Sequence, residues 1–269
     1  MSRVAVIIPC FNDGPMATEA VRSIQEDEGV ELIVVDDGST DSKTRTALAE
    51  LARSGISILH KENEGPASAR MAGVNATTAP YVYPLDADDL LLRDSLRLLA
   101  DALDAEPRAA FAYGDFEIFG DYAGYYRAPK RFDRWALLYA NHIPVCSLIR
   151  RKELVEAGGW KQLGYEDWDL WLALADRNCK AVYVNAAVYC RRVHGDRRLG
   201  GDRADHRRIY AEMCERHSEL FARRRELRRE SDPALWKRVA YPIVLGKKHL
   251  PVWLEEWLKR QLFKRGIAV

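Results

Sequence analysis

Long apolar runs are missing from this chain of 269 residues. No stretch reaches the roughly 18 uncharged apolar residues that a membrane-spanning helix needs, so such a helix is not expected. The N-terminus, MSRVAVIIPC, passes into a strand-like run without a small-residue cleavage site, which argues against a secretory signal. Internal repeats and low-complexity segments are also absent. With 48% hydrophobic and 30% charged residues, the chain has the composition of a globular protein with a sizeable core.

Cysteine is scarce and scattered. The five cysteines lie far apart in the sequence and form no C-x-x-C pair, which argues against a disulfide framework and against a zinc site. Their spacing fits reduced thiols in a cytosolic protein. They are Cys10, Cys146, Cys179, Cys190 and Cys214.

Net charge is also low, at +1, but the two signs are unevenly distributed. Residues 1–200 contain 24 Lys and Arg against 30 Asp and Glu, a net charge of −6. Residues 201–269 contain 17 against 10, a net charge of +7. The acidic part could bind a cation, and the basic part suits anionic lipid, nucleic acid or an acidic partner. A solvated helical face explains the basic part equally well.

Apolar runs and turn signals alternate through the first third of the chain. Short apolar runs predict buried strands over 4–9, 31–36, 56–60 and 81–86, with helices between them. Such repeats predict a parallel, right-handed open α/β sheet. Ligands bind beyond the carboxyl ends of the strands in these sheets, and two predicted ends carry acids. Further predictions are a helix capped by Asp94, a helix over 165–174, a short strand over 181–184 and basic helix from about 205.

Three acids follow the predicted fourth strand, in Asp86-Ala87-Asp88-Asp89. If the chain stays extended there, Asp86 and Asp88 point to one side and Asp89 points elsewhere. Two converging carboxylates repel each other unless a proton or a cation lies between them, and their oxygens suit Mg²⁺ or Mn²⁺. The alternative is an acidic turn that caps the next helix.

Polar residues also follow the second and third predicted strands. A carboxylate at Asp36 or Asp37 could accept hydrogen bonds from a ribose or a base, although phospho-acceptor receiver domains show the same pair. Arg70 lies on a helix opened by Asn63-Glu64-Gly65-Pro66. It could bind phosphate or be an exposed surface charge.

The neighbouring acids Glu166 and Asp167 begin the helix predicted over 165–174, between two aromatic residues. Aromatic walls raise the pKa of a carboxylate, as a general base requires, whereas a helix N-terminus lowers it. The sequence leaves this balance open. Further along, Arg192 and His194 could both reach an anionic leaving group, or His194 could bind the metal.

Seven segments in order, VIIPCFN, VVDDGST, NEGPASAR, LDADD, GGW, YEDWDL and RRVH, resemble the family 2 glycosyltransferases of GT-A fold. The resemblance covers about residues 3–198. It implies an α/β protein with an open, mostly parallel GT-A sheet flanked by helices and a helical C-terminal extension. The predicted division is a nucleotide-sugar domain over 1–205 and a basic, aromatic extension over 206–269. The Q-x-x-R-W signature of processive synthases is absent, which favours transfer of a single sugar.

The resemblance also implies roles for individual residues, and the patterns above supply the others. Asp167 is the implied general base, with Glu166 beside it, and Trp160 and Trp168 are predicted on the acceptor side. The cation, Mg²⁺ or Mn²⁺, falls on Asp86, Asp88 and His194. The predicted nucleotide-sugar residues are Pro9, Asn12, Asp36, Asp37, Asn63, Arg70, Asp86, Asp89 and Arg192.

The resemblance thus implies a metal-dependent, inverting glycosyltransferase. We expect it to move one sugar from a UDP- or dTDP-linked donor to a saccharide or lipid-linked acceptor, in bacterial cell-surface polysaccharide or glycoconjugate synthesis. A sugar-nucleotide pyrophosphorylase would need a Gly-rich loop where residues 10–13 read CFND. A non-catalytic nucleotide-binding module would leave Asp86, Asp88 and Asp167 unexplained.

Aromatic and basic residues of the tail resemble a segment that docks on anionic lipid. We therefore expect a cytoplasmic protein that can lie peripherally at the inner face of the membrane through residues 235–265. A helical cap over the acceptor cleft or a homodimer interface is the open alternative, and no nucleic-acid partner is expected. The residues concerned are Trp236, Trp253, Trp257, Phe263, Lys247-Lys248 and Lys259-Arg260.

Overall fold

Strand β1 (Val4–Cys10) lies inside the parallel half of the sheet, between β2 (Glu31–Asp37) and β4 (Tyr81–Pro84), with β3 (Ser57–Lys61) beyond β2. The computed structural model describes residues 2–195, 199–231 and 233–242. β1 consists of apolar residues because both of its faces are covered. Ile7 packs into one core cluster, and Val6 and Ile8 pack into the other.

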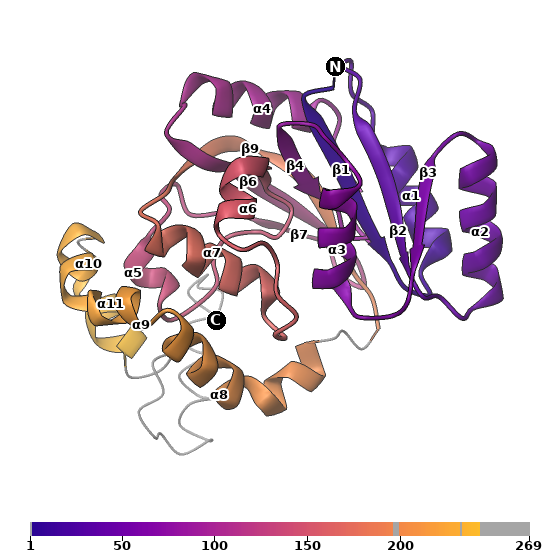
Figure 1. Cartoon of the computed structure of the whole chain (residues 1–269). Coiled ribbons are helices and arrows are strands. Elements are labelled where there is room, and N and C mark those ends of the chain that lie inside the picture. The colour runs from indigo at the N-terminus through magenta and orange to yellow at the C-terminus, as the bar shows by residue number, and fades with distance from the viewer. Residues whose placement is uncertain (1, 196–198, 232, 243–269) are drawn as a thin grey trace.

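Helices cover both faces of this half. α1 (Gly14–Ser23), α2 (Ser42–Arg53) and α4 (Ser95–Ala105) contribute to the cluster of Val6 and Ile8, and α3 (Pro66–Asn75) to that of Ile7. Figure 1 shows α1 and α2 close to β1–β3. The predicted strand and helix order of the first third is confirmed within a few residues at each boundary.

The second half of the sheet is mixed. β8 (Leu148–Arg150) is antiparallel to both β4 and β6 (Ala109–Gly120), while β9 (Lys180–Val193) is parallel to β6. The order in the described residues is β3-β2-β1-β4-β8-β6-β9-β5, with β5 (Leu90–Leu91) at one edge and β7 (Gly124–Tyr126) paired to β6. β8 starts near the carboxyl end of β4 and runs back along it. Because β8 is also antiparallel to β6, the chain can pass from β6 to β8 without a crossover helix. The strand predicted over 181–184 is longer than expected, because β9 pairs with β6 from Lys180 to Val193, with several register shifts on the way.

The acidic segment after β4 is a turn, so the extended geometry expected for it is wrong. β4 ends at Pro84, and the backbone N–H of Asp89 donates to the carbonyl of Asp86 at 3.0 Å. Asp94 occupies the N-cap position of α4 as predicted, but its side chain makes no capping hydrogen bond. Glu26 instead accepts hydrogen bonds from the first backbone N–H groups of this helix.

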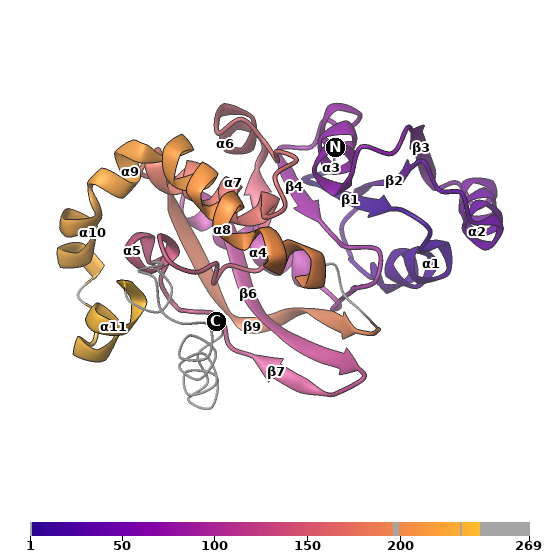
Figure 2. The same cartoon turned by 90° about the horizontal axis from the view of Figure 1, so that it is seen from below.

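Helices of the C-terminal third lie beside α5 (Arg134–Leu137) and α7 (Glu166–Asp176), and α6 (Arg151–Glu156) follows β8. Figure 2 shows the helices of the C-terminal third following one another along one side of the molecule. α8 (Leu199–Arg216) runs across the predicted domain boundary at residue 205, so the boundary falls within one helix. It is followed by α9 (Ser218–Ala222), α10 (Arg224–Ser231) and α11 (Leu235–Ala240).

Among the described helices, none combines the length and the apolarity that crossing a membrane requires. The tail residues from 243 onward lie outside the described residues. These include Trp253, Trp257, Phe263, Lys247-Lys248 and Lys259-Arg260, so their predicted lipid contact stays a prediction.

A buried ion cluster joins α7 to the helices that follow it. Asp169 is 1% exposed and accepts hydrogen bonds from Arg216 at 2.5 Å and from His217 Nε2 at 3.0 Å. Burial raises the pKa of Asp169, but these two partners outweigh burial and lower it below its ordinary value. The ionised carboxylate therefore stabilises the packing of α8 and α9 on α7.

Replacing Asp169 with Asn should lower the free energy of unfolding by about 2–4 kcal/mol at neutral pH, because it leaves buried donors without their anion. Because the pKa of Asp169 is lowered on folding, this difference should shrink as the pH falls below about 4. Urea unfolding measures both effects. Asp205→Asn, on the exposed side of α8, is the control and should change little. Equal losses in the two variants would contradict the assignment.

Candidate active site

Three carboxylates gather in the turn after β4. Asp86, Asp88 and Asp89 each offer an oxygen within 4.8 Å of the others, so the expectation that Asp89 faces elsewhere is wrong. Asp89 is buried and accepts a hydrogen bond from the Arg192 backbone N–H at 2.9 Å. Burial and the two neighbouring acids raise the pKa of Asp89 well above its ordinary value. A cation among the three oxygens would offset this repulsion.

His194 contacts the same cluster. Its Nε2 atom lies 3.1 Å from Oδ2 of Asp88, and its side chain is 44% exposed. Carboxylate oxygens are the ligands that Mg²⁺ and Mn²⁺ prefer, whereas an imidazole nitrogen is a softer ligand that suits other transition metals better. Asp86, Asp88 and Asp89 therefore form a set of oxygens that fits a divalent cation, and the predicted metal residue His194 lies beside this set, in contact with Asp88.

Arg70 lies buried between the acidic turn and the start of α7. One terminal nitrogen donates to Asp86 at 2.7 Å, and the other donates to Glu166 at 3.1 Å. Burial lowers the pKa of this guanidinium, but the two carboxylates outweigh burial and raise it. The alternative that Arg70 is an exposed surface charge is therefore wrong. Its side chain links two acidic groups that are 80 residues apart in the chain.

Asp167 is held at the N-terminus of α7. Its Oδ1 accepts from the Trp168 backbone N–H at 2.8 Å, and its Oδ2 accepts from Asn141 Nδ2 at 2.8 Å. Burial, followed by the nearby charge of Glu166, raises the pKa of Asp167 to about 6. The balance that the sequence left open is thus decided by burial, which outweighs the hydrogen bond at the helix N-terminus. Such a carboxylate can accept a proton at neutral pH.

Sequence reasoning missed Asn141. It lies in the loop between α5 and β8, where the sequence shows no recognisable motif. Its amide oxygen accepts from the Ile143 backbone N–H at 3.1 Å, which orients the amide nitrogen toward Asp167.

A second group of polar residues lies at the carboxyl ends of β1 and β2. Asp36 accepts from the Ser39 backbone N–H at 2.9 Å, and its other oxygen lies 2.8 Å from His60 Nδ1. Burial raises the pKa of Asp36, but the hydrogen bonds from Ser39 and His60 outweigh burial and lower it. His60 was also missed, because a single histidine at a strand end carries no sequence signal. Pro9 is half-buried at the end of β1.

Asp37 and Asn12 shape the loops around this group. Asp37 is buried and accepts from the backbone N–H groups of Glu64 and Gly65, at 3.1 and 2.7 Å. Asn12 accepts at 2.9 Å from two backbone N–H groups of the loop after β2. Asn63 is exposed in the loop that Asp37 holds. Nucleotide contacts by these residues stay predictions.

Arg192 supports the acidic turn from β9. Besides its backbone contact to Asp89, its Nε donates to the carbonyl of Asp88 at 2.9 Å. Trp160 and Trp168 are 4% and 5% exposed, and Nε1 of Trp168 donates to the Leu137 carbonyl. Their rings pack in the core, and the guanidinium of Arg70 lies 5.9 Å from the ring centroid of Trp160. The acceptor-side role of both residues stays a prediction.

A comparison with protein-family models establishes the family of this chain. Residues 5–156 match the model of glycosyl transferase family 2. The chain belongs to glycosyl transferase family 2. The matched segment contains the acidic turn and Arg70, and it ends ten residues before Glu166.

Curated relatives of this family 2 chain include an uncharacterized glycosyltransferase of Rickettsia conorii, 38% identical over 100 residues. That match covers 36% of this chain and only 16% of the relative, so the chain spans a small part of the first relatives it resembles. A longer match is to UDP-Glc:alpha-D-GlcNAc-diphosphoundecaprenol beta-1,3-glucosyltransferase WfgD of Escherichia coli. It is 27% identical and covers 70% of this chain and 75% of WfgD.

Solved structures share the fold of this family 2 chain. TarS 1-349 of S. aureus in complex with UDP-GlcNAc aligns with a TM-score of 0.66 at 15% identity, covering 100% of this chain and 82% of TarS. The mannosyltransferase PcManGT from Pyrobaculum calidifontis, in complex with GDP-Man and Mn2+, aligns with a TM-score of 0.61 at 20% identity. This match covers 99% of the chain and 76% of PcManGT.

Proposed function

We propose that this protein transfers a single sugar, with inversion, from a UDP- or dTDP-linked donor to an acceptor hydroxyl. The observation that carries the proposal is that Arg70 forms ion pairs with both Asp86 and Glu166. Arg70 thereby joins the acidic cluster after β4, which suits a cation, to the neighbouring acids Glu166 and Asp167. The pKa of Asp167 is raised to about 6. Donor binding and proton abstraction need these two groups side by side.

The carboxylate of Asp167 acts as the general base. It accepts the proton of the acceptor hydroxyl while that oxygen attacks the anomeric carbon opposite the leaving nucleoside diphosphate. Asn141 orients the carboxylate through its hydrogen bond to Oδ2. Arg70 places positive charge between the two acidic groups, close to where negative charge develops on the leaving diphosphate.

A divalent cation would be held by Asp86, Asp88 and His194, with Asp89 beside them. When bound, it neutralises charge on the donor diphosphate and on the leaving group. The Mn2+ in the PcManGT structure and the close carboxylates of this chain support the assignment. Arg192 keeps the turn in shape by binding the backbone of Asp88 and the side chain of Asp89.

We propose a saccharide or lipid-linked acceptor in bacterial cell-surface polysaccharide synthesis. WfgD, as its name states, acts on GlcNAc-diphosphoundecaprenol, and another relative is the succinoglycan biosynthesis protein ExoU of Rhizobium meliloti. A cytoplasmic location is part of the same proposal, because nucleotide sugars are the donor.

A panel of UDP-, dTDP- and GDP-sugars with Mn²⁺ or Mg²⁺ tests the proposal. Slow release of nucleoside diphosphate from one donor, accelerated by an acceptor, is the expected result. Pyrophosphate-dependent release of nucleoside triphosphate would instead identify a pyrophosphorylase. Binding of nucleotide without any turnover across acceptors would favour a non-catalytic module. The anomeric configuration of the product, read by NMR coupling constants, tests inversion.

A further inference from the structure

Helix α11 presents apolar side chains to solvent. Leu235 is 76% exposed, Trp236 39% and Val239 56%. Positions 235, 236 and 239 lie on one side of a helix. In the described residues, eight large hydrophobic side chains are exposed, and three of them are in this one helix. Such a concentration at the surface indicates a contact with something outside the chain.

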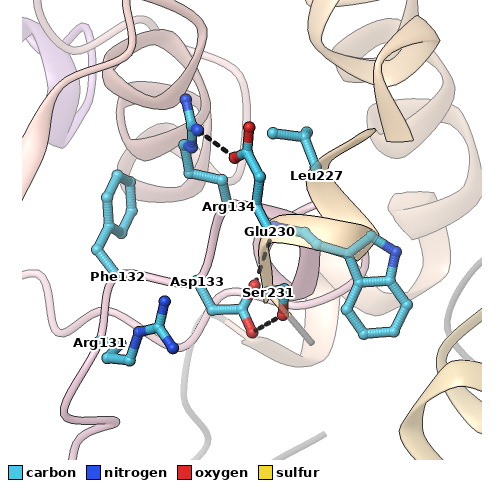
Figure 3. Close-up of a pocket in the computed structure, with 8 residues that line it drawn as sticks. Arg131, Phe132, Asp133, Arg134, Leu227, Glu230 and Ser231 are labelled. Carbon is cyan, nitrogen blue, oxygen red and sulfur yellow. Dashed lines mark hydrogen bonds and ion pairs between the residues drawn. The ribbon is translucent and has the colours of Figure 1, made fainter. Parts of the chain in front are cut away.

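The helices around this apolar face are fastened to the body of the protein. The ring of Tyr241, just after α11, stacks on Trp135 of α5 at 5.5 Å between centroids. Before it, Ser231 donates to Asp133 at 2.6 Å and Arg134 pairs with Glu230 at 2.5 Å, beside a cavity of about 180 Å³ (Figure 3). Residues before and after α11 therefore attach this helix to the body of the protein, and the side chains of Leu235, Trp236 and Val239 remain exposed.

The segment that contains the face is strongly basic. Residues 223–241 include seven Arg and Lys against three Asp and Glu. Lys237 Nζ lies 5.6 Å from the ring of Trp236. The exposed basic side chains are Arg224, Arg225, Arg228, Arg229 and Arg238. Apolar and indole side chains beside arginine are the composition of surfaces that bind at the boundary of an anionic bilayer.

We propose that α10 and α11 form a docking surface for an anionic phospholipid bilayer. Leu235, Trp236 and Val239 enter the headgroup region, and the arginines of α10 face the lipid phosphates. A second copy of the chain fits less well, because two copies would bring the same arginines together.

Vesicle co-sedimentation of the full chain tests the surface. The wild type should bind vesicles of equal parts POPC and POPG and bind pure POPC much less. The combined variant Leu235→Glu, Trp236→Glu and Val239→Glu should bind the mixed vesicles at least about tenfold more weakly, because it removes buried apolar area and adds anionic charge. These positions are exposed, so the variant should keep the wild-type circular dichroism spectrum.

The matched control is Leu98→Glu with Val155→Glu, which changes two exposed apolar residues elsewhere and should bind like the wild type. Arg228→Gln with Arg229→Gln should weaken binding to the mixed vesicles by about tenfold and reduce its sensitivity to salt. Equal binding by the wild type and the triple glutamate variant would overturn the proposal. So would a wild-type dimer that dissociates in that variant, which would make the face an interface between copies.

Vesicle binding does not depend on turnover, so its failure is distinguishable from failure of the proposed transferase activity. If both proposals hold, the triple glutamate variant should release nucleoside diphosphate from its donor in water at the wild-type rate. Its KM for a bilayer-embedded acceptor should rise while its kcat stays unchanged. An equal KM for that acceptor in both proteins would contradict a role of the surface in acceptor access.

Discussion

Replacing Asp167 with Asn is expected to lower kcat by about 10²–10⁴-fold while donor binding stays near the wild-type value, because that is the usual contribution of a general base. Asn keeps the size of the side chain, and its one amide oxygen can still accept from the Trp168 backbone N–H. Its amide nitrogen cannot accept from Asn141, and the side chain cannot take a proton. The measurements are steady-state release of nucleoside diphosphate in the presence of acceptor and calorimetric titration with the nucleoside diphosphate. The control is Asp176→Asn at the other end of α7, which should change neither quantity.

The pH profile distinguishes a base from a residue that only holds the loop. Because the pKa of Asp167 is raised to about 6, its carboxylate is ionised above that pH and protonated below it. In the wild type, kcat/KM should therefore fall about tenfold per pH unit below pH 6 and level off above it. The limb should be absent in the Asp167→Asn protein. A variant with full activity, or one that retains the limb, would remove Asp167 from the role.

Replacing Asp88 with Asn is expected to weaken Mn²⁺-dependent binding of UDP by at least about 100-fold. Mutating even the outer partners of metal ligands lowers metal affinity by about 10–100-fold, and Asp88 is proposed as a direct ligand. Asp88 also contacts His194, so one substitution removes two features of the cluster. Calorimetric titration with UDP, with and without Mn²⁺, measures the loss.

The control for this experiment is Asp101→Asn, an exposed acid on α4. It should bind UDP and Mn²⁺ like the wild type. The Asp88→Asn protein should retain only the weak UDP binding that the wild type shows without metal. An unchanged dissociation constant in the presence of Mn²⁺ would contradict the metal assignment, and it would leave the role of Asp167 untouched.

Arg70 explains why the two expected effects are not fully independent. It contacts Asp86 in the acidic turn and Glu166 beside the candidate base. Its charge also lowers the pKa of Asp167 against the larger effect of burial. A substitution that displaces Arg70 should therefore change both the metal-dependent affinity for nucleotide and the pH at which kcat/KM begins to fall. The reason is that the one buried guanidinium contacts both groups of acids.

The parallel half of the fold and the position of the site were predictable from the sequence by itself. Strands covered on both faces must be continuous apolar runs, and the four runs predicted four parallel strands that the structure confirms within a few residues. Acids at the ends of such strands reach one edge of the sheet, so the position of Asp36 beside the end of β1, opposite Cys10, followed from the parallel pairing. The clustering of Asp86 and Asp88 was predicted too, but a turn and not an extended segment produces it.

Only the tertiary structure decided the contacts between distant segments. The antiparallel β8, the bond of Asn141 to Asp167 and the pairing of Arg70 with Glu166 join residues 26 to 96 positions apart. No local pattern encodes such pairs, because their energy depends on which surfaces pack together. The same holds for the pKa of Asp167, which burial sets, and for the turn that brings Asp89 beside Asp86. The sequence determined which chemical groups stand at the strand ends, and the packing decided which of them touch and which carry charge.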